Sequence, residues 1–237
     1  MPEAPTPEDK SPQKVQSMFA AVAPAYDRLN HVLSLSLDRL WRRRCAVSLR
    51  GVEAPILDLC CGTGDQAVAL RRQGLDVVAA DFCFPMVRLS LPKFARLEAP
   101  RPRPLTADAL GLPFPDGSFG GVTVSFGVRN VADLDAALRE MHRVLGPGGR
   151  VAILEFAIPE APVLRALYLV YFRRILPRIG RLVSRHRSAY EYLPDSVVAF
   201  PQRRAFTDCL EGAGLVDVGW TEYSAGTVCL YSARKPA

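Results

Sequence analysis

A short apolar run that ends in a glycine loop constrains the fold of this chain more than any other feature. Residues 55–60 are apolar apart from Asp58 and are flanked by turn residues, which predicts a buried strand. Gly62 and Gly64 follow at once, and a helix is expected from Gly64 to Gln73. A strand, a glycine turn and a helix in this order are typical of an open α/β sheet, in which ligands bind at the carboxyl ends of the strands.

Apolar segments after this loop alternate between strand and helix patterns. Further helices are expected at residues 84–97 and 133–145, the second capped by Asp133. Alternation of this kind predicts a parallel sheet with helices on both faces. Four more strands are expected before residue 160, at residues 76–80, 104–107, 121–126 and 150–156.

The end of the chain has a different pattern. A helix is expected at residues 201–213, followed by strands at 216–223 and 227–233. The short turn between these strands, at Ala225 and Gly226, predicts an antiparallel hairpin. The sheet is therefore expected to be mostly parallel, with an antiparallel C-terminal hairpin.

Length and composition favour one domain. The chain has 237 residues, 49% of them hydrophobic, and no Gly/Ser-rich or charge-rich linker divides its interior. We expect one domain at residues 15–237, with helices from Val15 to Leu49 interrupted near Pro24. Residues 1–14 are rich in proline and acidic residues and predict a disordered tail, neither a signal peptide nor a membrane anchor.

The cysteines and histidines indicate no metal site. The six cysteines form no CxxC pair, Cys60 and Cys61 are adjacent, and the three histidines are far apart in the sequence. We therefore expect small buried thiols in a reducing cytoplasm and no bound metal.

Two classes of ligand fit the glycine loop. Residues 62–67 match the dinucleotide pattern GxGxxG/A, so NAD is one candidate. A pyrophosphate favours a helix N-terminus free of nearby anions, whereas Asp58 and Asp65 flank these glycines. S-adenosylmethionine has no phosphate and carries a sulfonium and an ammonium group, so acidic residues around the loop favour it instead.

Two further acidic residues lie where the next strands are expected to end. Asp81 follows the second strand, where its carboxylate can bind both ribose hydroxyls, a feature that suits NAD as well. Asp108 follows the third strand and can accept a hydrogen bond from the adenine amino group. Each acid alone could be a helix cap or a solvated turn residue. Together, at one edge of a parallel sheet, they favour S-adenosylmethionine.

The chain resembles the class I methyltransferases, and within them the quinone C-methyltransferases of menaquinone and ubiquinone biosynthesis. The resemblance extends from about Val15 onward and is most specific in residues 26–30 (YDRLN) and 125–130 (SFGVRN). One departure is Cys60-Cys61, where a glycine or alanine is commoner, and it should matter little because both thiols are small. Other matching segments are the loop at 58–65, LPFPDGSF at 112–119, PGGR at 147–150, LEF at 154–156, LPRIG at 176–180, and YEYL at 190–193 with Ser196.

The resemblance implies a Rossmann-like fold and a cofactor site. Seven strands should have the spatial order 3-2-1-4-5-7-6, with the last antiparallel. The implied cofactor is S-adenosylmethionine, with no metal. The candidate cofactor-binding residues are Asp58, Gly62 and Gly64 in the loop, together with Thr63, Asp81, Asp108, Ala109 and Ser125 from the resemblance.

The resemblance also implies methylation of a ring carbon on a polyprenylated hydroquinone. Conversion of demethylmenaquinol to menaquinol is the leading candidate. A 2-polyprenyl-6-methoxy-1,4-benzoquinol of ubiquinone biosynthesis presents a similar ring edge and stays open, as does another small hydrophobic acceptor such as a sterol or a polyketide. A binding module that has kept the fold without catalysis is the alternative from another class, and the intact set of candidate cofactor residues argues against it.

Three residues are candidates for the chemistry. Methyl transfer from a sulfonium needs alignment and removal of one proton, because the leaving group is already good. Arg129 is a candidate to stabilise a phenolate or to orient a water that takes the proton, and an ion pair in the turn at 130–133 is its structural alternative. Tyr26 and Asp27 are candidates to close over the cofactor, and capping of their own helix turn is the alternative.

Positive charge is concentrated in a basic and aromatic insertion at residues 162–193. No acidic residue lies between Ala161 and Tyr190, and the seven arginines there exceed the chain's net charge of +6. Such a segment predicts peripheral contact of a cytoplasmic protein with an anionic membrane through residues 163–187, or a cover for an isoprenoid tail. A solvated face on a core helix is the alternative. Nucleic acid is disfavoured because the segment is too apolar. The sequence leaves the oligomeric state open.

Overall fold

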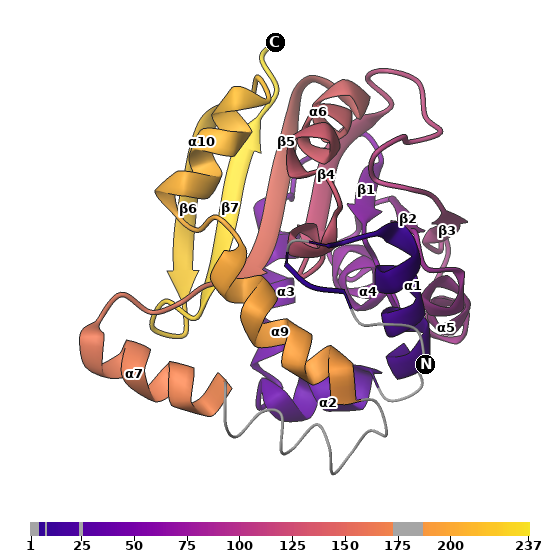
Figure 1. Cartoon of the computed structure of the whole chain (residues 1–237). Coiled ribbons are helices and arrows are strands. Elements are labelled where there is room, and N and C mark those ends of the chain that lie inside the picture. Colours follow the sequence, from indigo (N-terminus) through magenta and orange to yellow (C-terminus); the bar gives the residue numbers. More distant parts are fainter. Residues whose placement is uncertain (1–4, 8, 24–25, 173–186) are drawn as a thin grey trace.

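Seven strands form one mixed sheet at the centre of the molecule (Figure 1). The computed structural model describes residues 5–7, 9–23, 26–172 and 187–237, and only the backbone of 187–191. The spatial order of the strands is β3-β2-β1-β4-β5-β7-β6, which confirms the expected order. The strands are β1 (Ile56–Leu59), β2 (Val77–Asp81), β3 (Arg103–Thr106), β4 (Phe119–Ser125), β5 (Leu145–Phe156), β6 (Val216–Tyr223) and β7 (Val228–Arg234).

Strand direction agrees with the sequence pattern. β1 pairs in parallel with β2 and β4, β2 with β3, and β4 with β5. β7 is antiparallel to both β5 and β6, as expected for a C-terminal hairpin. All four residues of β1 are buried, because strands flank it on both sides and helices cover both faces. The near-continuous apolar run of this strand follows from that position.

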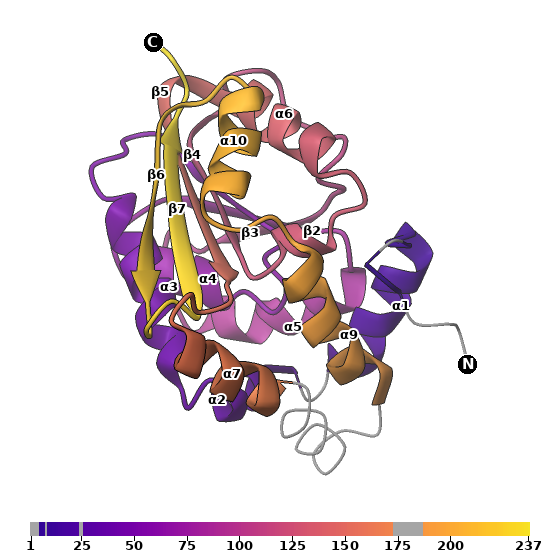
Figure 2. The same cartoon turned by 60° about the vertical axis from the view of Figure 1, so that its left-hand side comes forward.

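Helices cover the two faces of the sheet and lie over two separate apolar cores (Figure 2). On one face α3 and α4 contact the sheet together with α5, and on the other α6 and α10 do so. Asp133 caps α6, and its Oδ1 accepts a hydrogen bond from the Ala136 N–H at 2.9 Å, which confirms the predicted cap. The bounds are α3 (Leu37–Ser48), α4 (Asp65–Arg71), α5 (Phe84–Ala95), α6 (Leu134–Val144) and α10 (Arg204–Gly212).

The remaining helices gather beyond the carboxyl ends of the central strands. A small core of Leu29, Phe172 and Val197 joins α2 and α9 to the residues after α7. A second cluster, of Ala23, Cys83 and Met86, attaches the end of α1 to α5. These helices are α1 (Pro12–Val22), α2 (Tyr26–Leu33), α7 (Pro162–Val170) and α9 (Arg187–Ala199).

The N-terminal helices differ from the expected pattern in two places. α1 begins at Pro12, inside the stretch predicted as a disordered tail, with the proline in its first turn. A break separates α2 from α3, where Leu35 and Ser36 have φ angles of 52° and 61°. Neither residue is a glycine or a proline, so the sequence carries no turn signal there.

The basic insertion is described only in part. α7 and α9 are helical as expected, whereas residues 173–186, with five of the seven arginines, lie outside the described residues. Within the described chain, no helix is both long enough and apolar enough to cross a membrane.

Candidate active site

The loop after β1 has a backbone that few side chains tolerate. Gly62 and Gly64 have φ angles of 56° and 85°. A Cβ at Gly64 would lie 2.6 Å from the ring of Phe94, so only glycine fits there. Cys60 also has a positive φ, 54°, a conformation that disfavours any side chain. The φ angle therefore disfavours cysteine relative to glycine at this position, but not relative to alanine.

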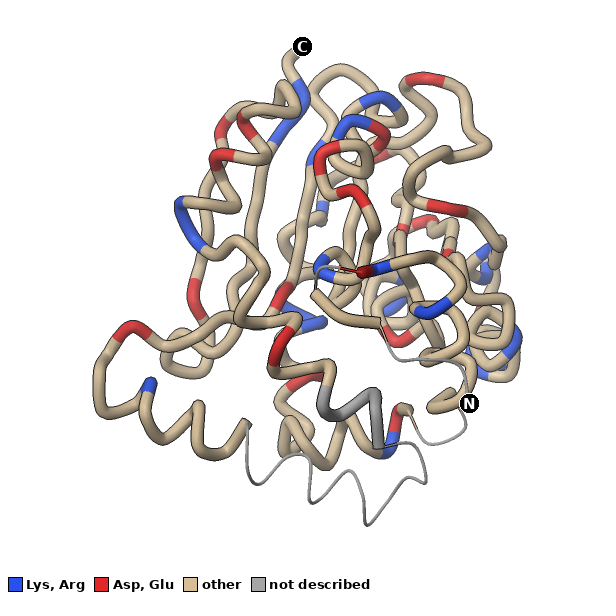
Figure 3. The backbone as a smooth tube through the Cα atoms, viewed as in Figure 1, with Lys and Arg blue, Asp and Glu red and all other residues tan. Residues whose placement is uncertain are grey.

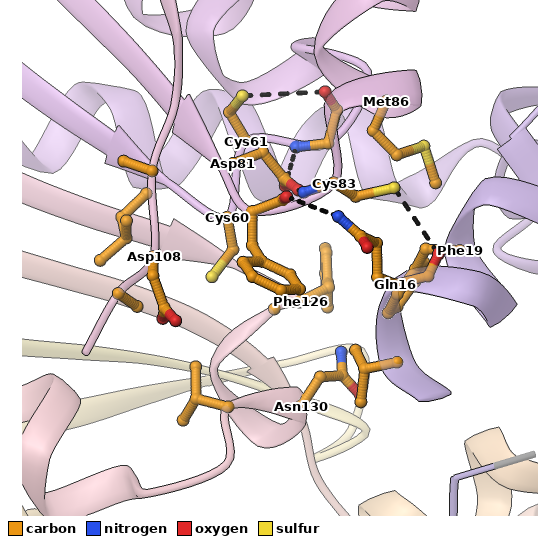
Figure 4. A pocket seen from close by; sticks show the side chains of 18 of the residues that line it. Gln16, Phe19, Cys60, Cys61, Asp81, Cys83, Met86, Asp108, Phe126 and Asn130 are labelled. Atoms are coloured by element: carbon orange, nitrogen blue, oxygen red, sulfur yellow. Dashed lines mark hydrogen bonds between the residues drawn. The ribbon is translucent and has the colours of Figure 1, made fainter. Parts of the chain in front are cut away.

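Asp81 ties this loop to the end of β2. Its Oδ2 accepts a hydrogen bond from the Gly62 N–H and its Oδ1 accepts one from the Cys83 N–H, both at 2.7 Å (Figure 4). Burial raises the pKa of Asp81, and the two N–H groups oppose that rise. Each carboxylate oxygen keeps a further lone pair for a ligand hydroxyl.

A cavity of about 110 Å³, here called the cofactor cavity, opens at the carboxyl ends of β1, β2 and β4. Asp108 follows β3 at the cavity, and its Oδ1 accepts a hydrogen bond from the Leu110 N–H at 3.0 Å. The buried Oγ of Ser125 has no hydrogen-bond partner within the described chain. The predicted cofactor residues that line this cavity are Gly62, Thr63, Asp81, Asp108, Ala109 and Ser125.

Helix α1 supplies a wall of the cofactor cavity that the sequence did not predict. Gln16 and Phe19 of α1 lie beside Asp81 and Cys83 (Figure 4). Gln16 Nε2 donates a hydrogen bond to the Phe82 carbonyl at 3.3 Å. Met18 and Phe19 begin a segment that matches the family, but the match assigned this helix no role at the cofactor site, and only the tertiary fold shows one.

Two of the predicted cofactor residues do not line the cavity. Gly64 packs against Phe94. Asp58 lies inside β1 and is fully buried, and neither oxygen has a hydrogen-bond partner in the described chain. Burial raises the pKa of Asp58 to about 8, an effect that the positive charge of Arg42 partly opposes. Asp58 is thus a buried acid behind the loop and not a lining residue.

Asp27 holds α2 against the glycine loop. It accepts a hydrogen bond from the Thr63 hydroxyl, and its Oδ2 lies 2.7 Å from the Lys93 ammonium. Lys93 also pairs with Asp65 and donates to the Thr63 hydroxyl at 3.1 Å. Burial raises the pKa of Asp65, but Lys93 and Arg42 together bring it below its ordinary value. The sequence did not single out Lys93, which comes from α5.

A cluster of His31, Asp38 and Asp65 adjoins this network. Ligand atoms of the three residues lie within 4.8 Å of one another. His31 Nδ1 lies 2.8 Å from Asp38, and Lys93 Nζ lies 2.5 Å from Asp65. Since the ammonium of Lys93 already supplies a cation, the arrangement gives no reason to assign a metal.

Arg129 forms a buried ion pair with Glu155. Its Nη1 lies 2.7 Å from Glu155 Oε1 and also donates to the Phe126 carbonyl. Both side chains are buried, Glu155 completely. The predicted alternative for Arg129 placed its ion pair in the following turn, but the partner comes from β5. The sequence signal that could have identified Glu155 as the partner is an acidic residue within an otherwise apolar strand.

A second cavity, here called the aromatic cavity, adjoins the cofactor cavity and has a volume of about 530 Å³. Tyr26, Arg42, Phe126 and Phe19 line both cavities. Burial raises the pKa of Tyr26. Arg129 lines the aromatic cavity but not the cofactor cavity. The aromatic residues that line this second cavity are Phe19, Tyr26, Trp41, Phe126, Phe156, Tyr168, Tyr171, Phe172 and Tyr192.

Replacing Asp58 by asparagine should change how stability depends on pH. The pKa of Asp58 is about 8 in the folded chain, against an ordinary value of 3.8. Between these values the folded protein keeps a proton that the unfolded chain has lost, so the free energy of unfolding falls as pH rises and levels off above about pH 8. Urea unfolding from pH 5 to 9 should show a smaller fall for Asp58→Asn than for the wild type.

The matched control is Asp135→Asn, the same change at an exposed position on α6. This variant should keep the wild-type fall. An equal fall in Asp58→Asn and the wild type would contradict the assignment of a buried proton to Asp58.

Comparison with known proteins agrees with this geometry. The model of the ubiE/COQ5 methyltransferase family matches residues 8–235. A demethylmenaquinone methyltransferase of Thermus thermophilus is 45% identical over 223 residues, 92% of this chain and all of the relative. The protein of the same name from Mycolicibacterium paratuberculosis is 43% identical over 230 residues, 96% of each chain.

Solved structures with low sequence identity share the fold. A SAM-dependent methyltransferase of Thermotoga maritima, a possible histamine N-methyltransferase, has a TM-score of 0.66 at 16% identity and covers 93% of this chain and 99% of its own. The [4+2]-cyclase SpnF has a TM-score of 0.64 at 18% identity, covering 99% and 98%. A cyclase among these structures shows that the fold alone does not determine the reaction. The family match covers nearly the whole chain and identifies the reaction class. The protein binds S-adenosylmethionine and belongs to the ubiE/COQ5 methyltransferase family.

Proposed function

We propose that this protein transfers a methyl group from S-adenosylmethionine to a ring carbon of demethylmenaquinol. The observation that carries the proposal is the pair of adjoining cavities. One is acid-lined and lies at the carboxyl ends of the strands, and the other is large, aromatic and joined to the first through Tyr26 and Phe126. The relatives named demethylmenaquinone methyltransferase, at 42–45% identity, support the choice of substrate.

The cofactor residues have separate tasks in this proposal. Asp81, held by two backbone N–H groups, binds the ribose hydroxyls, and Asp108 with Ala109 binds the adenine. Thr63 and the loop glycines leave room for the methionine part, and the unpartnered Ser125 hydroxyl is free to bond the ligand. Bound here, S-adenosylmethionine supplies an electrophilic methyl group on a positively charged sulfur.

The aromatic cavity holds the acceptor ring and aligns it. Tyr26 and Phe126 stand at the boundary of the two cavities, so they exclude water around the path of the methyl group. Arg129 stabilises the phenolate of the quinol, since a guanidinium stays protonated and is a poor base. The Glu155 carboxylate holds Arg129 in place. The ring carbon gains the methyl group and loses one proton, which passes to water.

In this scheme Asp27 positions other residues and does not contact a ligand. Because its carboxylate binds both Thr63 and Lys93, it holds α2 over the loop and keeps Tyr26 at the boundary of the cavities. Neither Asp27 nor Asp58 lines a cavity, so we assign neither of them contact with a ligand.

A methylation assay with purified protein tests the substrate. Reduced demethylmenaquinone with labelled S-adenosylmethionine should give methylated product, because reduction makes the ring carbon nucleophilic, and the oxidised quinone should give none. The matched acceptor is reduced 2-polyprenyl-6-methoxy-1,4-benzoquinone, for which kcat/KM should be lower. Normal menaquinone in a deletion strain, or a preference for the benzoquinol, would exclude the proposed substrate.

Removal of the buried ion pair should slow the chemical step. Arg129→Met combined with Glu155→Met deletes both charges, which avoids leaving one of them buried and unpaired. We expect kcat to fall on the order of 100-fold, the loss typical of a missing anion-stabilising group. The pH–rate profile should move to higher pH, because the phenolate must then form unaided. Affinity for S-adenosylmethionine, measured by calorimetry, should not change, and an unaltered kcat and pH profile would remove Arg129 from the mechanism.

We further propose that the protein contacts an anionic membrane on the side where the aromatic cavity lies. Exposed apolar side chains there include Leu35 at 85%, Val163 at 75% and Leu167 at 63% exposure. Helices α2 and α7 lie on one side of the molecule in both views, and few acidic residues lie along them (Figure 3). Val32 and Leu35 also line the cavity, so a quinol could enter it directly from the bilayer.

Vesicle flotation tests this membrane contact. Vesicles containing phosphatidylglycerol should bind the full-length protein, and the double change Leu35→Glu with Leu167→Glu should weaken binding by at least tenfold, since acidic groups oppose both insertion and an anionic surface. Leu91→Glu, at a 49% exposed position on α5, is the control and should bind as the wild type does. Equal flotation of the double variant and the control would contradict the assignment of this surface.

A further inference from the structure

Arg42 is a buried arginine that faces both cavities. It lies on α3, exposes 9% of its surface and lines the cofactor cavity as well as the aromatic cavity. Its Nε is buried without a hydrogen-bond partner, and no carboxylate of the described chain lies within 4.0 Å of its nitrogens. The contact that holds it is with an aromatic ring, since its guanidinium carbon lies 5.2 Å from the ring centre of Phe126.

A guanidinium in this state lacks a directly paired carboxylate, because Asp58 and Asp65 act on it only at longer range. Burial removes its hydration, and a contact with an aromatic face replaces only part of what is lost. The Arg129 guanidinium, equally buried a few residues beyond Phe126, has its carboxylate partner in Glu155. Arg42 is therefore the buried arginine of this site whose partner is expected to come from a ligand.

The charges of the cofactor cavity indicate which anion that is. The acidic residues that line it are Asp65, Asp81 and Asp108, and the basic residues of the described lining are Lys10 and Arg42. S-adenosylmethionine carries a sulfonium and an ammonium, which suit the acids, and one carboxylate, which they repel. Charge complementarity therefore favours one of the two cations as the partner of this carboxylate.

Position selects Arg42 over Lys10. Asp81, proposed to hold the ribose, ends β2, and Asp108, proposed to hold the adenine, follows β3, so the methionine part is expected toward β1 and β4. Helix α3 packs against α4, which begins at Asp65 directly after the β1 loop. Phe126, under the Arg42 guanidinium, directly follows β4. Arg42 therefore lies at the methionine end.

We propose that Arg42 binds the α-carboxylate of the methionine moiety of S-adenosylmethionine. The planar guanidinium matches a carboxylate with two parallel hydrogen bonds. Because Arg42 also lines the aromatic cavity, this contact holds the donor at the boundary with the acceptor. The inference rests on the cofactor and not on the identity of the quinol, so binding can test it in the absence of any methyl acceptor.

Calorimetry with two ligands tests the inference. Decarboxylated S-adenosylmethionine keeps the sulfonium, the amine and the nucleoside and lacks only the carboxylate. The wild type should bind S-adenosylmethionine about 10- to 100-fold more tightly than the decarboxylated ligand, the range for hydrogen bonds to a charged group. Arg42→Met should lose this preference, binding S-adenosylmethionine more weakly and the decarboxylated ligand as before. Arg42→Lys should keep part of the preference, since it keeps the charge without the planar fork.

The controls separate this role from a structural one. Arg43→Met removes an exposed arginine of the same helix and should bind both ligands as the wild type does. The ligand-free Arg42→Met protein should remain folded and melt close to the wild type, because the guanidinium has no carboxylate within 4.0 Å and loses only its contact with the Phe126 ring and longer-range attraction to Asp58 and Asp65. Equal affinity of the wild type for both ligands would overturn the inference without any variant. The inference would also be overturned if Arg42→Met kept the preference for S-adenosylmethionine while Lys10→Met lost it. A change in Arg42→Met that affected only the KM of the quinol would overturn it as well.

Discussion

The carboxylate of Asp81 joins the two loops on which the rest of the site depends. It accepts one hydrogen bond from the loop after β1 and one from the turn after β2, so both backbones keep the spacing that opens the cofactor cavity. Burial disfavours this charge, and the two N–H groups stabilise it. An apolar side chain would leave both donors without an acceptor. The same group that binds ribose in the proposed function therefore also maintains the cavity.

A second set of charges attaches the N-terminal helices to this frame. Lys93 pairs with Asp27 of α2 and with Asp65 at the start of α4, and Thr63 bonds to Asp27 between them. Helix α2 thereby brings Tyr26 to the boundary between the cavities. The acid-lined cavity and the aromatic one each suit one half of the reaction, a cationic methyl donor and an apolar ring, and the two meet at the residues that both share.

Much of the fold could be predicted from local pattern. Buried strands in a parallel sheet appear as apolar runs, the short turn at Gly226 indicates a hairpin, and Asp133 is a recognisable cap, and all three agree with the structure. The break at Leu35 and Ser36 could not be predicted, because both residues have a positive φ although neither is a glycine. The predicted end of the disordered tail at residue 14 was wrong, since α1 begins at Pro12. A proline-rich segment has the composition of a disordered one, and the sequence does not show which surface it packs against.

The sequence by itself favoured S-adenosylmethionine as the cofactor, since acidic residues at the ends of three successive strands must meet at one edge of a parallel sheet. The reaction class followed from the motifs that the chain shares with its family. The sequence could not decide which of the acidic residues face the ligand. Asp58 and Asp81 have the same chemistry, but Asp58 lies inside β1 opposite Ala79 and is buried in the core, whereas Asp81 ends β2 and lines the cavity. The partners of Asp27 and Arg129 come from elements distant in the chain, and Arg42 has no carboxylate within 4.0 Å in the described residues. Such distances are set only when the layers pack, so the tertiary structure alone decided these roles.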